Sequence, residues 1–372
     1  MKLTIERGAL LKSLGHVQNV VERRNTIPIL SNVLLEAGSN ALGLTATDMD
    51  LTIIERVPVS VGTGGAATVP AHTLHDIVRK LPEGSQVEID GGGEGGQATI
   101  RAGRSKFSLP TLPREDFPAT AGGELPHRFS LAAKDLRGLI DRSRFAISTE
   151  ETRYYLNGIY LHVAEEKGTS LLRAVATDGH RLARVEMEVP KGAAGMPGVI
   201  VPRKTVGELR KLIDETEEPI EVALSETRIR FAFDSVTLSS KLIDGNFPDY
   251  QRVIPTGNDK SMTVDRRMFA EAVDRVSTIA SEKSRAIKLS LKKNSMILSA
   301  SSPENGSASE ELEVGYGGNP IEIGFNARYL LDITAQLQGS EAEFKLADAA
   351  SPTLLGDAAD ASALYVLMPM RV

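Results

Sequence analysis

The sequence of 372 residues predicts an α+β protein built from three repeated domains. Three observations support this prediction. One spacing of apolar residues occurs three times along the chain, alternating strand patterns follow each occurrence, and segments rich in Pro and Gly separate the three stretches. Each copy then holds about eight strands and two helices, and the helices should gather on one side of antiparallel sheets.

Each copy begins with a short strand that runs into an amphipathic helix. In residues 3–14, apolar side chains lie at relative positions 0, 2, 7 and 11, and the same spacing begins again at Phe129 and at Met262. Apolar residues two apart indicate a strand with one buried face, and the later spacing fits one face of a helix. The copies are offset by 126 and 133 residues, which indicates repeated domains because solenoid repeats are far shorter.

Alternating residues predict three strands after the first helix of each copy, and a second strand–helix unit after those strands. Three further strands then close the domain. The segments expected in the first copy are 32–36, 42–46, 51–57, 67–71, 74–81, 87–90, 98–101 and 106–109. The corresponding segments are 158–162, 171–176, 182–187, 199–203 and 206–213 in the second copy, and 286–291, 296–300, 310–314, 321–325 and 329–337 in the third.

Domain boundaries are expected where Pro and Gly collect. The dipeptides Phe117-Pro118 and Phe247-Pro248 precede two such stretches, and their recurrence is a further sign of duplication. We therefore expect three domains, at residues 1–121, 127–254 and 260–372.

The composition excludes several classes of function. Hydrophobic residues make up 41% and charged residues 25% of the chain, as in ordinary globular proteins. The absence of Cys excludes disulfides, Cys-ligated zinc and thiol catalysis. The first residues lack the apolar run of a signal peptide, and no stretch approaches membrane-spanning length. We expect a cytoplasmic protein with no membrane partner.

Charge is distributed unevenly between helices and the rest of the chain. The net charge is −6, yet the six helices expected at 6–24, 71–80, 134–144, 203–214, 265–285 and 326–338 together carry +8. The remainder then carries −14, which predicts one basic and one acidic surface. No helix-turn-helix, zinc finger or RNA-binding aromatic motif is present, so nucleic acid would be held by diffuse charge without sequence preference.

One short stretch, residues 175–184, concentrates polar chemistry. It contains Thr177-Asp178, and the same pair recurs as Thr47-Asp48, with a more degenerate third copy at Ser301-Ser302. This repetition predicts a turn in which the Asp side chain bonds local backbone. The middle copy alone continues with Gly179-His180-Arg181.

Two other interpretations of local motifs are weaker. Asp178 and His180 could share one face of a strand as an acid–base pair, but no repeated nucleophile or third orienting group accompanies them. The glycine-rich run 91–96 satisfies a dinucleotide fingerprint, but a strand pattern follows it where a helix would be needed, so we expect a hairpin loop. No metal-ligand spacing occurs. We expect no enzyme activity, no catalytic residue, no metal and no cofactor.

Several strings resemble the bacterial DNA sliding clamp family, the beta subunit of DNA polymerase III. They are RYYLNG (153–158), TDGHRL (177–182), VPRK (201–204), DGNFPDY (244–250), GFN (324–326) and the terminal YVLMPMRV (365–372). The resemblance covers the whole chain. It implies a processivity factor for chromosomal replication: a head-to-tail homodimer whose six domains form a ring around double-stranded DNA, with helices lining the hole.

The family also implies a groove that binds linear peptides of the replicative polymerase, the clamp loader and repair proteins. Apolar peptide side chains would fill it, and a peptide carboxylate or amide would meet Arg181 or Arg252. The implied groove residues are Leu156, Thr177, Gly179, His180, Arg181, Leu182, Pro248, Arg252, Val253, Asn326, Tyr329, Val366, Met368, Pro369, Met370 and Arg371. The sequence departs from the family pattern at Ser284, Ala350 and Pro352.

The resemblance implies two further sets of residues. Those facing DNA would be Arg24, Arg153, Tyr154, Tyr155, Arg203 and Lys204. Those at the dimer interface would be Arg104, Lys106, Phe107, Leu109, Ile279, Ala280 and Glu304, with Arg104 and Lys106 facing Glu304, Glu310 or Glu311. Two rival functions stay open: a hydrolase that uses Asp178 and His180, and a peptide-binding scaffold that does not encircle DNA.

Overall fold

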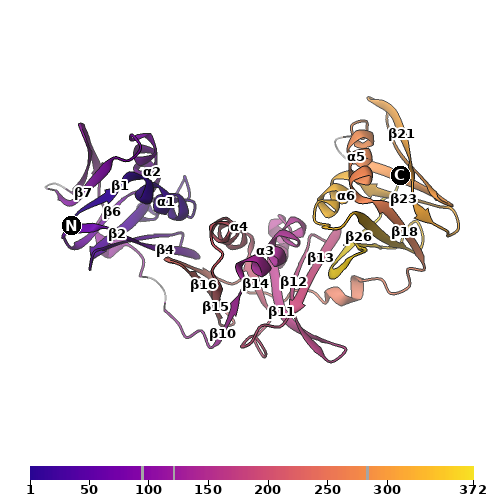
Figure 1. Cartoon of the computed structure of the whole chain (residues 1–372), viewed down its shortest axis with the longest axis horizontal. Coiled ribbons are helices and arrows are strands. Elements are labelled where there is room, and N and C mark those ends of the chain that lie inside the picture. Colours follow the sequence, from indigo (N-terminus) through magenta and orange to yellow (C-terminus); the bar gives the residue numbers. More distant parts are fainter. Residues whose placement is uncertain (94–95, 120–121, 282–284) are drawn as a thin grey trace. The chain divides into compact units, whose positions relative to one another are not determined.

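The computed structural model describes residues 1–93, 96–119, 122–281 and 285–372, so Ser284 lies outside the described residues. The chain divides into two compact units (Figure 1). The first contains Met1–Leu136, Pro190–Ala193 and Lys204–Leu242. The second contains Arg137–Val189, Ala194–Arg203 and Ile243–Val372. Each sheet belongs entirely to one unit.

The first unit contains two antiparallel sheets. The smaller has the strand order β5 (Ser60–Thr63), β1 (Lys2–Glu6), β7 (Gln86–Gly93), β8 (Gln97–Ala102) and β9 (Ser105–Pro110). The larger has the order β10 (His127–Leu131), β15 (Ile220–Leu224), β16 (Arg228–Phe233), β17 (Val236–Lys241), β4 (Leu51–Pro58), β3 (Ala41–Thr47), β2 (Asn32–Gly38) and β6 (Gly65–Pro70).

The helices of the first unit bury their apolar faces against these sheets. Helices α1 (Arg7–Gln18) and α2 (Ala71–Lys80) contact each other, and α1 also contacts β3 and β4. Leu10, Leu14 and Val17 of α1 are fully buried. Helix α4 (Arg203–Leu212) begins at the boundary between the units. Short 3-10 turns are η1 (Pro28–Ser31), η2 (Arg114–Asp116) and η5 (Ile213–Glu215).

The second unit repeats this arrangement of sheets. Its larger sheet has the order β14 (Val199–Pro202), β11 (Gly158–Glu166), β12 (Thr169–Thr177), β13 (Arg181–Glu188), β26 (Asp360–Leu367), β25 (Thr353–Asp357), β24 (Glu341–Leu346), β18 (Lys260–Asp265) and β22 (Gly315–Tyr316). Its smaller sheet has the order β21 (Gly306–Glu313), β20 (Ser295–Ser302), β19 (Ala286–Lys292) and β23 (Ile321–Asn326).

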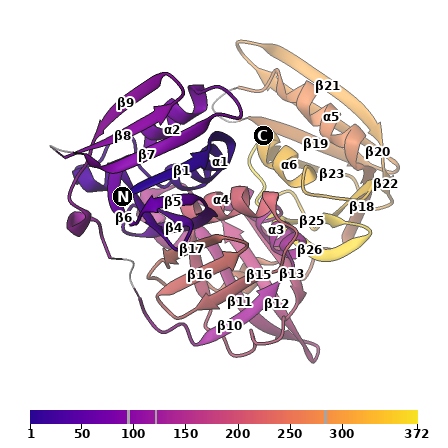
Figure 2. The same ribbon diagram turned by 60° about the vertical axis from the view of Figure 1, so that its left-hand side comes forward.

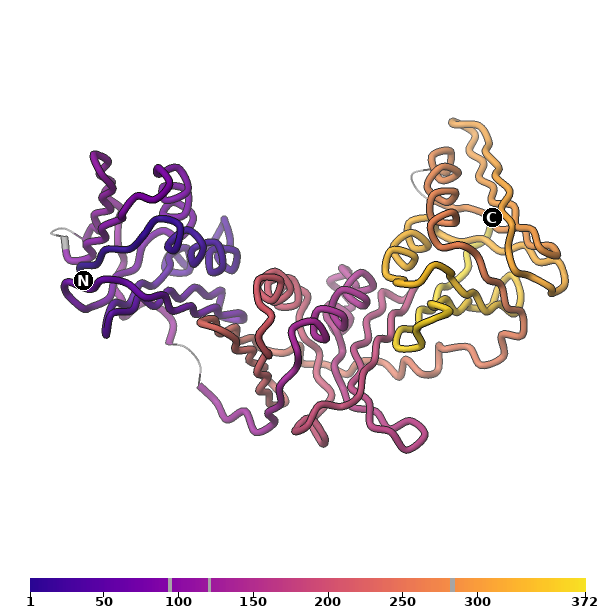
Figure 3. Tube along the Cα trace, viewed as in Figure 1, coloured from indigo at the N-terminus to yellow at the C-terminus, as the bar shows by residue number. Residues whose placement is uncertain are grey.

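Helices α5 (Arg266–Ser277) and α6 (Ala327–Thr334) contact each other, and α5 crosses one face of the smaller sheet (Figure 2). The tube trace shows the same pairing of α5 with α6 (Figure 3). Helix α3 (Ala133–Asp141) spans the unit boundary, and the short turns are η3 (Arg144–Ala146), η4 (Glu151–Leu156) and η6 (Tyr250–Val253).

Strand pairing joins consecutive copies of the repeat in the same way twice. Strand β4 of the first copy pairs antiparallel with β17 of the second, and β13 of the second pairs antiparallel with β26 of the third. In each case the fourth strand of one copy, which is the third after its first helix, pairs with the last strand of the next copy. Continuous sheets therefore connect the copies, since each joint is a ladder of backbone hydrogen bonds.

All the strands and helices expected from the periodicity overlap observed elements, but several helices are shorter. The first was expected to continue to residue 24 and ends at Gln18, and the fifth was expected to continue to residue 285 and ends at Ser277. At the latter end, Ser277 Oγ donates to the carbonyl of Asp274, as does Thr278 Oγ1. Such side chains compete for the last carbonyls of a helix. Two short edge strands, β5 and β22, were not expected because they lack alternation or length.

A half-buried histidine stabilises the contact between the first two copies. His16 Nδ1 lies 2.7 Å from Glu55 Oε2, and His16 Nε2 lies 3.3 Å from Glu215 Oε1 of η5. Burial disfavours the imidazolium, but the hydrogen bond to Glu55 and the charges of Glu55 and Glu215 outweigh it, so the pKa of His16 is raised. Protonation therefore strengthens the contact between α1 and η5.

We expect the stability of the first unit to depend on His16 in a pH-dependent way. Because the folded pKa is raised, the stabilisation is fully present below the ordinary value of about 6.5 and is lost as pH rises through the folded pKa. An imidazole NMR titration should locate the raised pKa of His16. The melting temperature of the protein should fall as pH rises through that value. His16→Asn should remove this pH dependence and His127→Asn should retain it; an unchanged profile in H16N would contradict the assignment.

Candidate peptide groove and nucleic-acid-facing residues

The turn between β12 and β13 is built by its own side chains. Asp178 Oδ1 accepts hydrogen bonds from the backbone N–H groups of His180 at 2.9 Å and Arg181 at 3.0 Å. Thr177 Oγ1 donates to the carbonyl of Arg181 at 2.7 Å. The backbone of Gly179 has φ of 88°, and a Cβ there would lie 2.6 Å from a guanidinium nitrogen of Arg153. Glycine adopts this left-handed backbone without strain, and a side chain here would displace the end of Arg153.

The twin turn between β3 and β4 uses the same bonds. Asp48 Oδ1 accepts from the N–H groups of Asp50 at 3.0 Å and Leu51 at 2.7 Å, and Thr47 Oγ1 donates to the carbonyl of Leu51 at 3.0 Å. The turn chemistry predicted from the repeated Thr-Asp pair is confirmed. Met49 stands where the later turn has Gly179, with φ of 78°.

An apolar groove of about 210 Å³ opens beside the second of these turns. Leu182 on β13 faces Val366 on β26 in the strand register, and both are buried. Met368, just beyond β26, is 42% exposed and contributes one wall. The lining residues are Leu156, Thr177, Gly179, Arg181, Leu182, Pro248, Asp249, Tyr250, Val253, Val366 and Met368.

Most of the groove set implied by the resemblance gathers at this site. Of the sixteen residues, nine line the groove, and seven lie outside its lining: His180, Arg252, Asn326, Tyr329, Pro369, Met370 and Arg371. Sequence reasoning missed Asp249 and Tyr250. Both lie in the string DGNFPDY. The sequence did offer one signal, since Tyr250 follows two positions after Pro248, which was itself assigned to the groove.

Tyr250 forms a rigid floor. It is 5% exposed, and its hydroxyl lies 3.0 Å from His162 Nε2. The ring of Tyr160 stacks on His162 at 4.6 Å between centroids and on Phe247 at 4.8 Å. Burial lowers the pKa of His162, which favours the neutral imidazole. A neutral ring nitrogen can form a hydrogen bond with the hydroxyl of Tyr250.

Arg181 is bound on all sides within the chain. Its guanidinium donates to Asp178 Oδ2 at 3.1 Å, to Asp332 Oδ2 at 2.5 Å and to the carbonyl of Phe145 at 2.7 Å. It also lies 4.3 Å from the ring centroid of Tyr329. The expectation that Arg181 or Arg252 meets a peptide carboxylate or amide stays a prediction, and the guanidinium of Arg181 is already bound within the chain to two carboxylates and a carbonyl. Arg252, which is 84% exposed and paired with Asp249 at 2.8 Å, is the accessible cation beside the groove.

The acid–base interpretation of Asp178 and His180 receives no support from their contacts. Both carboxylate oxygens of Asp178 accept bonds from the turn and from Arg181. The ring of His180 instead stacks with Tyr329, with centroids 6.4 Å apart. Within the described part of the chain, no group of three or more His, Asp or Glu side chains could hold a metal ion.

The residues expected to face DNA differ in their solvent exposure and in their ion pairs within the chain. Arg24 and Arg203 are exposed, and Tyr154 is 54% exposed and meets Tyr155 edge to face. Arg153 pairs with Glu150 at 3.1 Å.

Lys204 differs from these residues because two carboxylates bind it. Its ammonium group contacts Glu22, Asp48 Oδ2 at 2.6 Å and the carbonyl of Val20 at 3.0 Å. Burial opposes the charge, yet the hydrogen bonds from Asp48 and Glu22 raise the pKa of Lys204. The expectation that Lys204 faces DNA stays a prediction; within the chain, Lys204 joins α4 to the turn of the first copy.

The uneven charge distribution persists with the observed helix bounds. Helices α1 and α4 carry +2 and +3, α2 and α5 carry +1 each, and α3 and α6 are neutral, so the described helices together carry +7 in a chain of net charge −6. None of these helices is both long and apolar enough to cross a membrane.

The residues expected at the dimer interface lie on or near two sheet edges. Phe107 on β9 and Ile279 after α5 are half-buried, whereas Leu109 and Ala280 are buried within the single chain. Arg104, Lys106 and Glu304 are exposed. Glu310 on β21 is bound by Arg275 of its own chain at 2.6 and 3.1 Å, and Glu311 accepts from Ser295 at 2.6 Å. Their expected contacts with Arg104 and Lys106 of a second chain stay predictions.

Two of the departures from the family pattern lie in the loop before β25. Ala350 is exposed, and its N–H donates to Asp348 Oδ1 at 2.8 Å. The carbonyl of Pro352 accepts from Asn258 Nδ2 at 3.0 Å. Neither residue lines the groove.

The repeated helix pairs on antiparallel sheets, joined edge to edge and bordered by an apolar groove, define the DNA clamp fold. Family models of the DNA polymerase III beta subunit match throughout the chain: the N-terminal domain at 1–121, the central domain at 130–249 and the C-terminal domain at 251–371. The chain belongs to the bacterial beta sliding clamp family, whose members are non-catalytic processivity factors, and it is a replication clamp.

Relatives and solved structures agree over the full length. The beta sliding clamp of Caulobacter vibrioides is 55% identical over 372 residues, covering 100% of both chains. That of Escherichia coli is 39% identical over 373 residues, again covering 100% of both. The crystal structure of the Bartonella birtlesii clamp bound to griselimycin has a TM-score of 0.97 at 51% identity, covering 100% of both chains. The predicted fold class and family are confirmed.

We expect Arg181 to be structurally indispensable, although it borders the groove. Arg181→Lys replaces a planar fork bound to three acceptors by one ammonium group, so it should lower the free energy of unfolding by about 2–3 kcal/mol. Arg252→Lys changes an exposed cation with one ion pair and should stay within about 0.5 kcal/mol of wild type. Guanidinium unfolding compares the two; equal midpoints would contradict the role assigned to Arg181.

Proposed function

We propose that this chain forms a head-to-tail homodimer that encircles double-stranded DNA without sequence preference. It tethers the replicative polymerase, the clamp loader and repair proteins through peptides bound in the groove. The chain acts in the cytoplasm, without catalysis, and its three domains are 1–121, 127–254 and 260–372. The single observation that carries this proposal is the strand joint made twice between consecutive copies, β4 with β17 and β13 with β26.

The repeat leaves one such joint without an internal partner. The fourth strand of the last copy is β21, and the last strand of the first copy is β9. Each stands at the end of its sheet, with a single neighbouring strand among the described residues. A second copy of the chain supplies the missing partner for each edge, and two such joints close a ring.

The charges of these two edges complement each other. Arg104 lies directly before β9 and Lys106 lies on it, whereas β21 carries Glu311 and Glu313 and follows Glu304. Attraction of this kind favours the head-to-tail joint over a joint between like edges. The two identical edges of one type would repel each other.

The groove favours an extended peptide with apolar side chains. Its lining of Leu, Val, Met and Pro excludes water from Leu or Phe side chains of a ligand, and Tyr250 gives it a fixed floor. Arg252 lies at the rim and is available for a carboxylate or amide of the peptide. The third copy adds Met368, whose unbranched side chain adapts to several partners.

DNA retention should be topological. Because the helices carry only +7 per chain, contacts with phosphates should be weak and sensitive to salt. Once loaded on a closed circle, the protein should remain bound at high salt until the DNA is cut. Release is measured by gel filtration of labelled clamp before and after linearisation. Equal retention on circular and linear DNA would instead favour a peptide-binding scaffold.

Mutations should affect dimerisation and peptide binding independently of each other. Phe107→Asp combined with Ile279→Asp should yield folded monomers near 40 kDa by light scattering, with the groove and its peptide affinity retained. Val253→Asp, at an exposed groove position, should leave a dimer of twice that mass and weaken peptide binding by about tenfold or more. A wild-type protein that is monomeric at micromolar concentration would rule out the proposed ring.

A further inference from the structure

The C-terminal segment that follows β26 is held by two backbone hydrogen bonds, one on each side of Pro369. The N–H of Met368 donates to the carbonyl of His180 at 2.9 Å, on the turn that borders the groove. The N–H of Met370 donates to the carbonyl of Gly324 at 2.9 Å, on strand β23 of the smaller sheet. Residues 368–372, which we name the tail, therefore connect the groove turn to the edge of a second sheet.

The second attachment exists because position 324 has no side chain. A Cβ on Gly324 would lie 2.5 Å from the carbonyl oxygen of Met370 and 2.5 and 2.7 Å from the two methyl groups of Val372. Real Cβ atoms do not approach backbone so closely, so the tail would have to move. The φ of Gly324 is not in the left-handed region, so its role is space for the tail and not an unusual backbone conformation.

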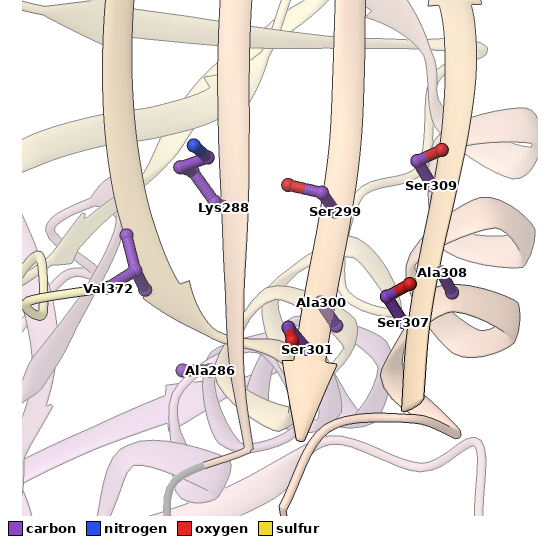
Figure 4. Close-up of a pocket in the computed structure, with 9 residues that line it drawn as sticks. All are labelled: Ala286, Lys288, Ser299, Ala300, Ser301, Ser307, Ala308, Ser309 and Val372. Atoms are coloured by element: carbon purple, nitrogen blue, oxygen red, sulfur yellow. The ribbon is translucent and has the colours of Figure 1, made fainter. Parts of the chain in front are cut away.

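The end of the tail occupies the face of the smaller sheet next to this glycine. Val372 borders a hollow together with Ala286 and Lys288 of β19, and its side chain lies beside that strand (Figure 4). Met370 adds an antiparallel bridge to the edge of β23. The tail thus docks as a short extra strand, by backbone pairing and by the packing of one aliphatic side chain.

We propose that Gly324 is a positioning residue for the partner-peptide groove. By admitting the tail to the edge of β23, it holds Met368 against the groove although Met368 itself is 42% exposed. Without this attachment, the wall would lie on a segment that has lost its bond and its packing against β23, and segments with few contacts open readily. This inference rests on the proposed function of the groove and adds to it the residue that fixes one wall.

The expected effect follows from the cost of ordering a released tail. A peptide that binds the released form must immobilise Met368 and its neighbours, and such ordering costs enough to raise Kd roughly three- to tenfold. The rest of the groove, from Leu156 to Val366, is anchored elsewhere and should persist. Binding should therefore weaken without being abolished.

The experiment compares Gly324→Ala with Gly317→Ala, a control in the same domain where a Cβ would meet nothing within 4 Å. Tail docking is read from amide exchange of Met368 and from the methyl NMR signals of Val372. Peptide affinity is read by fluorescence anisotropy with a labelled peptide carrying the clamp-binding segment of the replicative polymerase. G324A should accelerate exchange about tenfold and raise Kd roughly three- to tenfold, whereas G317A should match wild type in both.

A second variant guards against misfolding of G324A. Met370→Pro removes the N–H that bonds Gly324 and leaves β23 unchanged, so it should release the tail and weaken the peptide to the same extent. A docked tail in both variants, or a released tail with unchanged Kd, would overturn the proposal. Failure of the wild-type protein to bind the peptide would instead contradict the proposed function, and with it the role of Gly324 at the groove.

Discussion

The pairing of sheet edges between consecutive repeats is the constraint on which the rest of the structure depends. A strand at the edge of a sheet presents unpaired N–H and C=O groups, and these must be satisfied by water, by a cover or by another strand. Here the edges β4 and β13 are each completed by the last strand of the following copy, β17 and β26. Each domain thus finishes a sheet begun by its neighbour.

Side chains reinforce both of these joints at equivalent positions. His16 and Arg142 are 126 residues apart, the offset of the repeat. His16 contacts Glu215 of the second copy, and Arg142 Nη1 donates to Asp360 Oδ2 at 2.8 Å in the third. Different residue types fulfil the same task, and only the histidine makes its joint sensitive to pH near neutrality.

The Thr-Asp turns take part in the joints in a second way. In the first unit, Asp48 receives Lys204 from α4, the second helix of the next copy. In the second unit, Arg181 reaches from the turn to Asp332 on α6, which is again the second helix of the next copy. In the first joint the turn supplies the carboxylate and the helix the cation, and in the second joint the turn supplies the cation and the helix the carboxylate. Of the polar residues that resemble a catalytic site, Asp178 therefore holds its own turn and Arg181 forms an ion pair between repeats.

Periodicity predicted the strands and helices well because each repeat alternates apolar residues with a clear buried face, as at Leu3, Ile5, Leu10 and Leu14. It failed where hydrogen bonds between distant residues decide the outcome. The commitment of Arg181 to Asp332 and of Lys204 to Glu22 and Asp48 involves partners more than a hundred residues away. Neither pairing is visible in the sequence, where the family resemblance assigned Arg181 to a peptide and Lys204 to DNA. The floor residue Tyr250 was missed because its role arises from burial under β13 and β26, which no local pattern reveals.

The groove combines a fixed part and an adaptable part for physical reasons. Its floor and turn are held by buried contacts: Tyr250 by His162, and the turn by Asp178 and Arg181. Its outer wall is Met368, a flexible side chain held only through the backbone of a short tail. A rigid floor limits the entropy lost when a peptide binds, and a compliant wall allows peptides of different shape to be accepted. The tail supplies the compliant wall without loosening the sheets that join the repeats.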